Sequence, residues 1–567
     1  MLSNSKKKAL RVKFKKIYKN SSNEFVREII ALINNFNKKN KKSSINISQN
    51  TALVISYGDS IMDVRKKSLK VFRSFFNKHL SNYFNSVHFL PFYPSSSDSG
   101  FAVKDHYKIE PRLGNWSDIR NFSKKTTVMA DLVINHASSR GLWFANFLKD
   151  KSPGKNYFFT VNNKFNVSKV VRPREHRLLK KIKLFNKNQY LWRTFSPDQI
   201  DLNFKNPKVL MRFLKIIINS LNHGVRIFRL DAIAYLWKEN GTKCINHTNT
   251  HNIIKFIRFF TEQLNTESLI ITETNLPEKE NLSYFGNQDE ANWIYNFSLP
   301  PLIVYSLLFE DSSKITQWSK KLKKTKNKNN YLNFIASHDG IGMRPIEGLI
   351  NNKQLKKLFT RLKKNGGEFS FRKVQGKAKK VYEANITLFN AFEKSDFDKK
   401  GKYFLERFIS AHAIMLAFEG IPAVYFNSIF GTSNDNSKYI ISGNKRDLNR
   451  YRWNKVRLEK SLKNKNSKQT IYYKNMTNLL KVRKKQKAFH PDAAQTTLKF
   501  GSKIFAIKRI SIDKKQSITC LTNVTCEKQL VNLNMNKGKF KNLLQDKLIF
   551  VNKRLELKPF QTVWITN

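Results

Sequence analysis

The sequence is poor in cysteine, and it has no long apolar stretch. Its three cysteines, Cys244, Cys520 and Cys526, are an odd number without a regular spacing, which argues against a disulfide framework and predicts reduced thiols. No segment approaches the roughly 18 consecutive apolar residues of a membrane-spanning helix. The basic segment 1–20 also lacks the apolar core of a secretion signal. We therefore expect a cytoplasmic protein.

Acidic residues are scarce: 41 Asp and Glu stand against 105 Lys and Arg, which gives a net charge of +64 over 567 residues. A charge of this size attracts nucleic acid or anionic membranes when it is gathered on one surface. Here the lysines are spread over nearly every segment, beside many asparagines, which indicates a drift in composition. We expect neither nucleic acid nor a membrane as a partner.

Apolar residues make up 40% of the chain and aromatic residues 13%, enough for a large core. Short apolar segments alternate with longer segments of helical period, a pattern that predicts parallel strands joined by crossover helices. Seven or eight such units suit a closed barrel, so we predict an α/β fold of the (β/α)8 TIM type. The clearest strands are expected at 52–56, 87–91, 127–135, 225–233, 268–273, 333–337 and 422–426.

Changes in this rhythm predict the domain organisation. We expect an N-terminal extension with one helix and a linker, a catalytic barrel, and a C-terminal all-β domain. Within the barrel domain we expect an inserted subdomain after the third strand and a long mobile loop at the active site, with Gly366-Gly367 as its hinge. The expected bounds are 1–50 for the extension (helix 23–37), 51–485 for the barrel, 137–201 for the insertion, 350–400 for the loop and 486–567 for the β domain.

Three acidic residues, Asp231, Glu273 and Asp339, stand at or just after expected strand ends. The carboxyl ends of parallel barrel strands open on one face, so we expect these side chains to form a cluster there. Cleavage of a glycosidic bond needs two carboxyl groups on either side of the bond, about 5–5.5 Å apart in enzymes that retain configuration. Asp231 and Glu273 are the expected pair.

Arg229 lies two residues before Asp231, on the same side of an extended strand. A guanidinium there would hold Asp231 ionised, although an ion pair without catalysis fits the same spacing. His136 and His338 end two other strands; their spacing matches no zinc signature, so we expect donors to sugar hydroxyls and no metal site. Taken alone, each histidine fits a structural role as well.

Longer motifs carry a resemblance to a known family. DLVINH (131–136), FRLDAIAY (228–235), TETN (272–275) and ASHD (336–339) stand in the order and spacing of the four signature regions of the alpha-amylase superfamily, glycoside hydrolase family 13. HFLPFYPSSSDSGFAVKDHYKIEPRLGNWSDI, ASHDGIGMRP and GIPAVYFNSIFG with RDLNR resemble its sucrose phosphorylase subfamily, which includes glucosylglycerate phosphorylases. The resemblance runs from about residue 53 to residue 453.

The resemblance implies roles for individual residues. It makes Asp231 the nucleophile, Glu273 the general acid and base, and Asp339 the stabiliser of the transition state. We expect the pKa of Glu273 to be raised and Asp339 to stay charged. The positions expected to bind substrate are Asp98, Phe101, His136, Arg229, Tyr235, His338, Arg344 and Arg446, with Tyr235 matching a phosphate-contacting tyrosine and Lys238 and Arg344 as further hypotheses for phosphate.

The family resemblance predicts a hexosyl phosphorylase that passes through a covalent glucosyl-enzyme and releases α-glucose 1-phosphate. Thr274-Asn275 and Arg344 are more similar to the glucosylglycerate branch, and Glu383 departs from sucrose phosphorylases, which carry glutamine at this place. In that branch an additional arginine would contact a carboxylate with two bonds. We therefore expect glucosylglycerate as substrate before sucrose.

Other functions stay open at this point. Sucrose phosphorylase itself is one alternative, and a retaining α-glucosidase or transglucosidase that uses water or a sugar hydroxyl is another. A protein that only binds carbohydrate or nucleic acid would not need a complete nucleophile and acid set. We expect an α-glucoside and inorganic phosphate as small-molecule partners and no metal or organic cofactor, and we leave a homodimer open.

Overall fold

The centre of the molecule is a closed barrel of eight parallel strands in a computed structural model, which describes residues 2–19, 23–325, 329–374, 377–533, 538–551 and 554–566. The strands follow the order β1-β17-β13-β12-β11-β10-β4-β3 around the barrel. The predicted fold class is confirmed. The bounds are β1 (Leu53–Ser56), β3 (Ser86–Phe89), β4 (Thr127–Val133), β10 (Val225–Asp231), β11 (Leu269–Thr272), β12 (Trp293–Tyr295), β13 (Asn330–Asn333) and β17 (Ile421–Tyr425).

Two details of the barrel differ from the sequence prediction. Strand β12 was not predicted, because its three residues, WIY, are too short to show a pattern. The strand expected at 333–337 is β13, which ends at Asn333. His338 and Asp339 therefore lie on a loop beyond the strand and not at its end.

Amphipathic helices surround the barrel. Helix α6 begins at Pro207 after an Asn206 cap, whose side chain accepts a hydrogen bond from the Lys208 N–H, and it buries nine residues of its inner face. Helix α9 is buried almost all round, as its apolar sequence LPPLIVYSLLF requires. The surrounding helices are α3 (Ser68–His79), α4 (Trp116–Ser123), α6 (Pro207–Asn222), α7 (Thr248–Glu262), α9 (Leu299–Phe309), α10 (Ser313–Lys321), α13 (Phe404–Ala417) and α17 (Lys468–Lys484).

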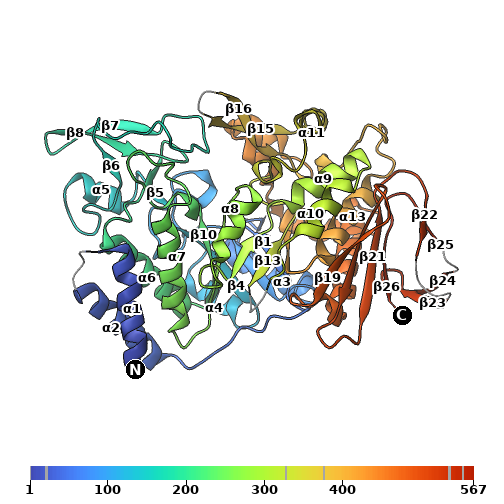
Figure 1. Cartoon of the computed structure of the whole chain (residues 1–567), viewed down its shortest axis with the longest axis horizontal. Coiled ribbons are helices and arrows are strands. Elements are labelled where there is room, and N and C mark those ends of the chain that lie inside the picture. The colour runs from blue at the N-terminus through green and yellow to red at the C-terminus, as the bar shows by residue number, and fades with distance from the viewer. Residues whose placement is uncertain are drawn as a thin grey trace.

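The N-terminal extension forms two helices, α1 (Asn4–Ile17) and α2 (Asn23–Lys39), so the expectation of one helix is wrong. Helix α1 buries Leu10 and Phe14, and the Phe14 ring packs against Phe256 of α7 at 5.5 Å between centroids. The many lysines of α1 hide this apolar stripe in the sequence. The extension lies on the outer helices of the barrel, at the opposite end of the molecule from the C-terminal sheet (Figure 1).

The insertion after the third strand carries helix α5 (Leu142–Leu148) and the small sheet β6-β8-β7. Its strands are β6 (Thr160–Val161), β7 (Leu179–Leu184) and β8 (Lys187–Trp192). Phe159 and the fully buried Trp192 give it a core of its own. A short antiparallel pair, β5 (His136–Ser138) with β9 (Gln199–Asp201), connects it to the barrel.

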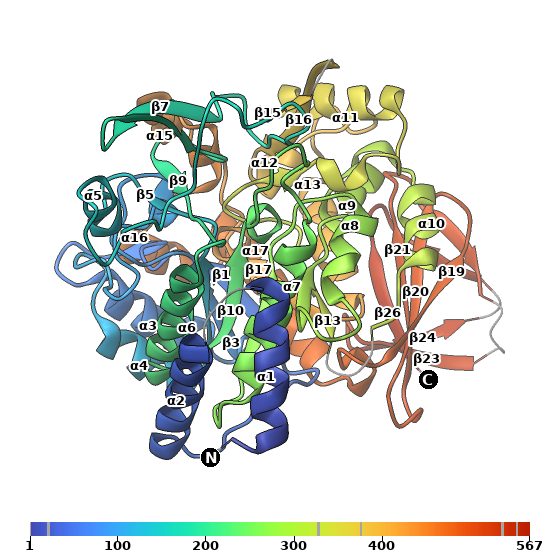
Figure 2. The same ribbon diagram turned by 60° about the vertical axis from the view of Figure 1, so that its left-hand side comes forward.

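Segment 350–400 forms a helix and a β-hairpin, so the prediction of a long loop without regular structure is wrong. It holds helix α11 (Asn352–Lys364) and the hairpin β15 (Glu368–Val374) and β16 (Lys377–Asn385), which pairs with β14 (Ile341–Gly342). Gly366 has a φ of +85° and its N–H bonds the Lys363 carbonyl, so it ends α11 where a hinge was expected. Both this hairpin and the inserted sheet lie at one end of the barrel (Figure 2).

The C-terminal region is a six-stranded antiparallel sheet with a two-stranded pair beside it, and the boundary at 486 stays a prediction. Buried Arg483 and Arg509 connect it to the barrel through bonds to backbone carbonyls. No helix in the described part of the chain is long and apolar enough to cross a membrane. The sheet strands are β19 (Ala494–Lys499), β20 (Ile504–Ile510), β21 (Ser517–Asn523), β26 (Thr562–Thr566), β23 (Gly538–Asn542) and β24 (Lys547–Val551), and the pair is β22 (Gln529–Asn532) with β25 (Arg554–Leu557).

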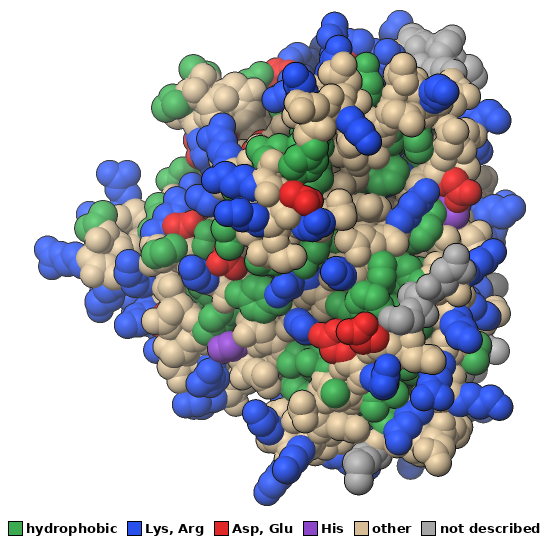
Figure 3. Space-filling model, turned by 90° about the vertical axis from the view of Figure 1, so that its left-hand side faces the viewer, with side chains coloured by type: hydrophobic (Ala, Val, Ile, Leu, Met, Phe, Trp, Pro, Cys, Tyr) green, Lys and Arg blue, Asp and Glu red, His purple; other side chains and the backbone are tan. Residues whose placement is uncertain are grey.

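The positive charge is spread over the surface. Figure 3 shows lysine and arginine side chains scattered over the face that carries the N-terminal helices, with few acidic ones between them. They form no single stripe on this face, in agreement with the compositional origin inferred from the sequence.

Candidate active site

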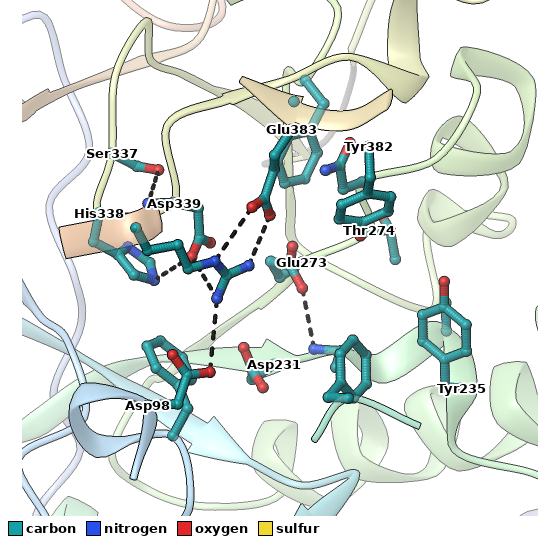
Figure 4. Close-up of a pocket in the computed structure, with 18 of the residues that line it drawn as sticks. Asp98, Asp231, Tyr235, Glu273, Thr274, Ser337, His338, Asp339, Tyr382 and Glu383 are labelled. Atoms are coloured by element: carbon teal, nitrogen blue, oxygen red, sulfur yellow. Dashed lines mark hydrogen bonds and ion pairs between the residues drawn. The ribbon is translucent and has the colours of Figure 1, made fainter. Parts of the chain in front are cut away.

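A pocket of about 780 Å³ opens where the barrel strands end (Figure 4). Ten of the eleven residues predicted to form the site line it, and Arg344 does not. Residues far apart in the sequence meet here because parallel strands all end on this face. The ten are Asp98, Phe101, His136, Arg229, Asp231, Tyr235, Glu273, His338, Asp339 and Arg446.

Asp231 is the last residue of β10, and Arg229 points to the same side of that strand. The Arg229 Nη1 donates to Asp231 Oδ1 at 2.8 Å and also to Asp131 of β4, which stands opposite Arg229 in the sheet register. All three side chains are buried. The guanidinium is therefore fixed between two carboxylates at the base of the pocket.

Glu273 follows β11 directly and enters the pocket beside Asp231 (Figure 4). The backbone N–H of Ala232 donates to Glu273 Oε2 at 3.1 Å, and Arg229 Nη2 lies 4.0 Å from Oε1. One guanidinium thus contacts both carboxyl groups of the predicted pair. The two carboxyl groups share one pocket, as glycoside cleavage requires.

Burial is the main influence on this pair. It raises the pKa of Asp231 against the lowering effect of Arg229, and the repulsion by Glu273 adds to the rise; the sequence had led us to expect a pKa held low by Arg229, so this expectation is corrected. Burial also raises the pKa of Glu273, as expected, against the lowering effect of Arg229. Two neighbouring carboxyl groups of this kind retain a proton more readily than isolated ones. The 2.8 Å ion pair favours charge on Asp231, which leaves the proton to Glu273.

Asp339 has the opposite character. Burial opposes its charge, but Arg446 at 3.0 Å, His338 and Arg450 at 3.7 Å together lower its pKa, so Asp339 stays ionised. His338 Nε2 lies 3.2 Å from Asp339 Oδ1. Burial lowers the pKa of His338 to about 3, which leaves it neutral at pH 7.

Asp98 and Phe101 form one wall of the pocket. Asp98 Oδ1 lies 3.3 Å from Arg450 Nη1, and the Phe101 ring stacks on His338 with centroids 5.1 Å apart. Gly100 has a φ of +112°, and a Cβ there would come within 2.5 Å of the Pro91 carbonyl. Only glycine fits this turn, which aims Asp98 into the pocket.

His136 is held by the same wall. Its Nε2–H donates to the Phe101 carbonyl at 3.1 Å, and burial lowers its pKa, so the ring is neutral. Its Nδ1 lies 3.4 Å from Asn135 Nδ2, so both ring nitrogens have partners in the protein. The expected role of His136 as a donor to a sugar hydroxyl stays a prediction.

The residues proposed for phosphate fall into three cases. Tyr235 lines the pocket, and its buried hydroxyl lies within reach of a side-chain hydrogen bond from Arg344. Arg344 lies buried next to Tyr235. Burial raises the pKa of Tyr235, and the nearby charge of Arg344 lowers it in part. The Nε and Nη1 atoms of Arg344 have no hydrogen-bond partner in the described chain. Lys238 forms a buried ion pair with Asp201 at 2.7 Å and does not line the pocket, so the phosphate hypothesis for it is wrong.

Sequence reasoning missed Arg174 and Arg450 as parts of this site, and it noted Glu383 only as a departure from the family pattern. Arg174 comes from the insertion and lies 4.9 Å above the ring of Tyr382. Glu383 lies on β16 and forms two bonds to Arg446, at 2.7 and 3.2 Å. Arg174 lies far from any predicted strand end, so its local sequence does not indicate a place in the site. Arg450 could have been found, because it is the last residue of the motif RDLNR.

Comparison with known proteins agrees with this geometry. The family model "Alpha amylase, catalytic domain" matches residues 83–365. The chain is 36% identical over 519 residues to a glucosylglycerate phosphorylase of Allomeiothermus silvanus, covering 91% of each chain, and 34% identical over 519 residues to one of Escherichia coli, covering 91% of this chain and 92% of the relative.

Among solved structures, the sucrose 6F-phosphate phosphorylase of Thermoanaerobacter thermosaccharolyticum matches with a TM-score of 0.73 at 21% identity, over 91% of this chain and 99% of the other. Its identity is low enough that it supports the fold alone. The sequence relatives show the family: this chain belongs to the alpha-amylase superfamily, glycoside hydrolase family 13. Within it, the chain falls in the subfamily of sucrose and glucosylglycerate phosphorylases, as its motifs predicted.

Proposed function

We propose that this enzyme is a retaining glucosyl phosphorylase that converts glucosylglycerate and phosphate into α-glucose 1-phosphate and glycerate. The observation that carries the proposal is the contact of Arg229 with both Asp231 and Glu273 in one buried pocket, beside the charged Asp339. Relatives at 34–36% identity over nine-tenths of the chain are named glucosylglycerate phosphorylases. Their name and this geometry support the same reaction.

The first step is the transfer of glucose to the enzyme. Glu273 gives its proton to the glycosidic oxygen while an oxygen of Asp231 attacks the anomeric carbon from the opposite face. The C1–O bond to glycerate breaks, its electrons stay on the glycerate oxygen, and a β-glucosyl ester forms on Asp231. Asp339 stabilises the positive charge that develops on the sugar ring.

In the second step a phosphate oxygen attacks the anomeric carbon from the face that glycerate has left. The ester bond to Asp231 breaks, and the two inversions together retain the α configuration. Glu273, now ionised, accepts a proton if the attacking phosphate carries one. Tyr235, which lines the pocket beside Arg344, is the proposed phosphate contact.

The choice of glucosylglycerate over sucrose depends on an anionic acceptor. Five carboxylates, those of Asp98, Asp231, Glu273, Asp339 and Glu383, line the pocket, so an acceptor with a carboxylate of its own needs a free cation. Arg344 has two buried nitrogens without a hydrogen-bond partner among the described residues, directly behind Tyr235. We propose that Arg344 binds the carboxylate of the glycerate unit. Sucrose has no charged group for Arg344 to bind.

The remaining expectations belong to the same proposal. The enzyme acts on two small molecules, an α-glucoside and inorganic phosphate, and needs no metal or organic cofactor. Three cysteines without a disulfide among them fit a reducing cytoplasm. Nucleic acid and membranes are not proposed as partners, and a homodimer stays untested.

An assay of glucose 1-phosphate formation tests the proposal. Glucosylglycerate, glucosylglycerol, sucrose and sucrose 6′-phosphate are each incubated with the enzyme, with and without phosphate. We expect phosphate-dependent product, with the highest kcat/KM for glucosylglycerate. Preference for sucrose would correct the substrate, and release of free glucose without phosphate would replace the phosphorylase by a hydrolase or transglucosidase.

A further inference from the structure

Glu383 and Arg446 form a two-bond ion pair at the mouth of the pocket. Arg446 Nη2 donates to Glu383 Oε1 at 2.7 Å, and Nε donates to Oε2 at 3.2 Å. The Glu383 side chain is only 3% exposed. The other end of the guanidinium, Nη1, lies 3.0 Å from Asp339 Oδ1 and 3.7 Å from Asp98 Oδ2 (Figure 4). The guanidinium of Arg446 therefore faces three carboxylates. Its Nε and Nη2 edge faces Glu383, and its Nη1 faces Asp339 and Asp98.

The backbone around Glu383 fixes its place. Glu383 lies in the middle strand of the three-stranded sheet, opposite Gly342 of β14 and Ser370 of β15. Strand β14 begins two residues after Asp339, so the same sheet also anchors the loop that carries Asp339. A side chain mounted on a paired strand holds its position better than one on a free loop.

The contacts of Asp339 show what this pair achieves. Within the described chain, its ion pairs with Arg446, Arg450 and His338 all fall on Oδ1, and none of them falls on Oδ2. An arginine whose Nε and Nη2 edge were free would turn that edge to a neighbouring carboxylate and bind both of its oxygens. Glu383 occupies that edge.

We propose that Glu383 is a positioning residue: it engages the Nε and Nη2 edge of Arg446, so that Asp339 keeps one carboxylate oxygen for the glucosyl unit. This inference deepens the proposed function and rests on it for the identity of the sugar. Arg174 Nη2 lies 3.9 Å from Glu383 Oε1, so the carboxylate also joins the insertion to the loop of Arg446 across the pocket mouth. Glu383 itself takes no part in bond making.

The test is Glu383→Gln, which keeps the shape and removes one negative charge. The amide NH2 then opposes an N–H of Arg446, donor against donor, and Arg446 turns toward Asp339. We expect the KM for glucosylglycerate to rise about 10- to 100-fold, the range for lost hydrogen bonds between charged groups, and kcat to fall as well, because Asp339 also stabilises the transition state. Loss of the negative charge also lowers the pKa of Glu273, so the basic limb of the pH profile of kcat/KM moves to lower pH.

Two further variants separate positioning from a general loss of structure. Glu347→Gln is the matched control. Glu347 accepts two hydrogen bonds from Arg372, each of 2.9 Å, and neither residue lines the pocket. We expect this variant to keep the wild-type KM and pH profile. Glu383→Asp keeps the charge but shortens the reach, so we expect a raised KM with the basic limb in its wild-type place.

The outcome is decided on properly folded enzyme, with active sites counted by titration. An unchanged KM and an unchanged basic limb in Glu383→Gln would overturn the proposal, as would equal effects in Glu347→Gln. KM and the pH profile are also measured with α-glucosyl fluoride in the absence of phosphate, so that the test of Glu383 does not depend on phosphorolysis. If the wild type failed to use phosphate, the proposed function would be overturned, but the test of Glu383 would stay valid.

Discussion

Glu273→Gln is the most informative single substitution in the acid pair. The amide keeps the size of the carboxyl group and an oxygen to accept the hydrogen bond from the Ala232 N–H, so the pocket keeps its shape. What it loses is the acidic proton, which burial favours by raising the pKa of Glu273. General acid catalysis contributes roughly 10²- to 10⁴-fold, or about 3 to 5 kcal/mol of barrier. We expect turnover of glucosylglycerate to fall by this factor.

Two donors distinguish this role from general damage. Fluoride leaves without a proton, so transfer from α-glucosyl fluoride to phosphate should keep most of its rate in Glu273→Gln. The acid must be protonated to act, so the wild-type kcat/KM for glucosylglycerate falls as pH rises through the raised pKa of Glu273, and the variant should lose this basic limb. Equal losses on both donors, or a basic limb that persists in the variant, would refute the assignment of Glu273 as the acid.

Three other substitutions test separate parts of the account. Asp231→Asn should abolish turnover of both donors while the thermal unfolding midpoint stays near wild type, and measurable glucosyl transfer in a clean preparation would contradict a nucleophile at this position. Arg344→Ala should raise the KM for glucosylglycerate about 10- to 100-fold, the range for lost charged hydrogen bonds, and leave that for sucrose unchanged; equal changes would remove the reason to prefer glucosylglycerate. Lys238→Met leaves the fully buried Asp201 without its ion-pair partner, so denaturant unfolding should show a loss of about 3 to 5 kcal/mol, and a loss below about 1 kcal/mol would contradict the importance of this pair.

The barrel was predictable because most of its strands are short apolar runs that alternate with longer helical segments. The parts that were missed have weaker local signals. Strand β12 is three residues long, and the apolar spacing of Leu10, Phe14 and Ile17 in α1 is hidden among lysines. Segment 350–400 forms a helix and a hairpin whose stability comes from pairing with β14, a contact that its local sequence does not reveal.

The candidate site was predictable where chemistry coincides with a strand end. Asp231 and Glu273 follow this rule, and His136 and Arg229 do so as well. The surrounding cations do not follow this rule: Arg446 was predicted only through the family resemblance, and Arg174 was missed because it reaches the pocket from the insertion, whose path depends on tertiary packing. The sign of the pKa shift of Asp231 was also beyond the sequence: it results from burial and from carboxylates on other strands, which outweigh the neighbouring Arg229.

The most direct test of the central claim is to trap the glucosyl-enzyme and find the residue that carries it. A 2-deoxy-2-fluoro-α-glucosyl fluoride slows the second step, so mass spectrometry of the digested enzyme should find one fluoroglucosyl group on the peptide that contains Asp231, removed again when phosphate is added. A label on Glu273 or Asp339, or turnover of glucosylglycerate to the β anomer of glucose 1-phosphate, would contradict the account.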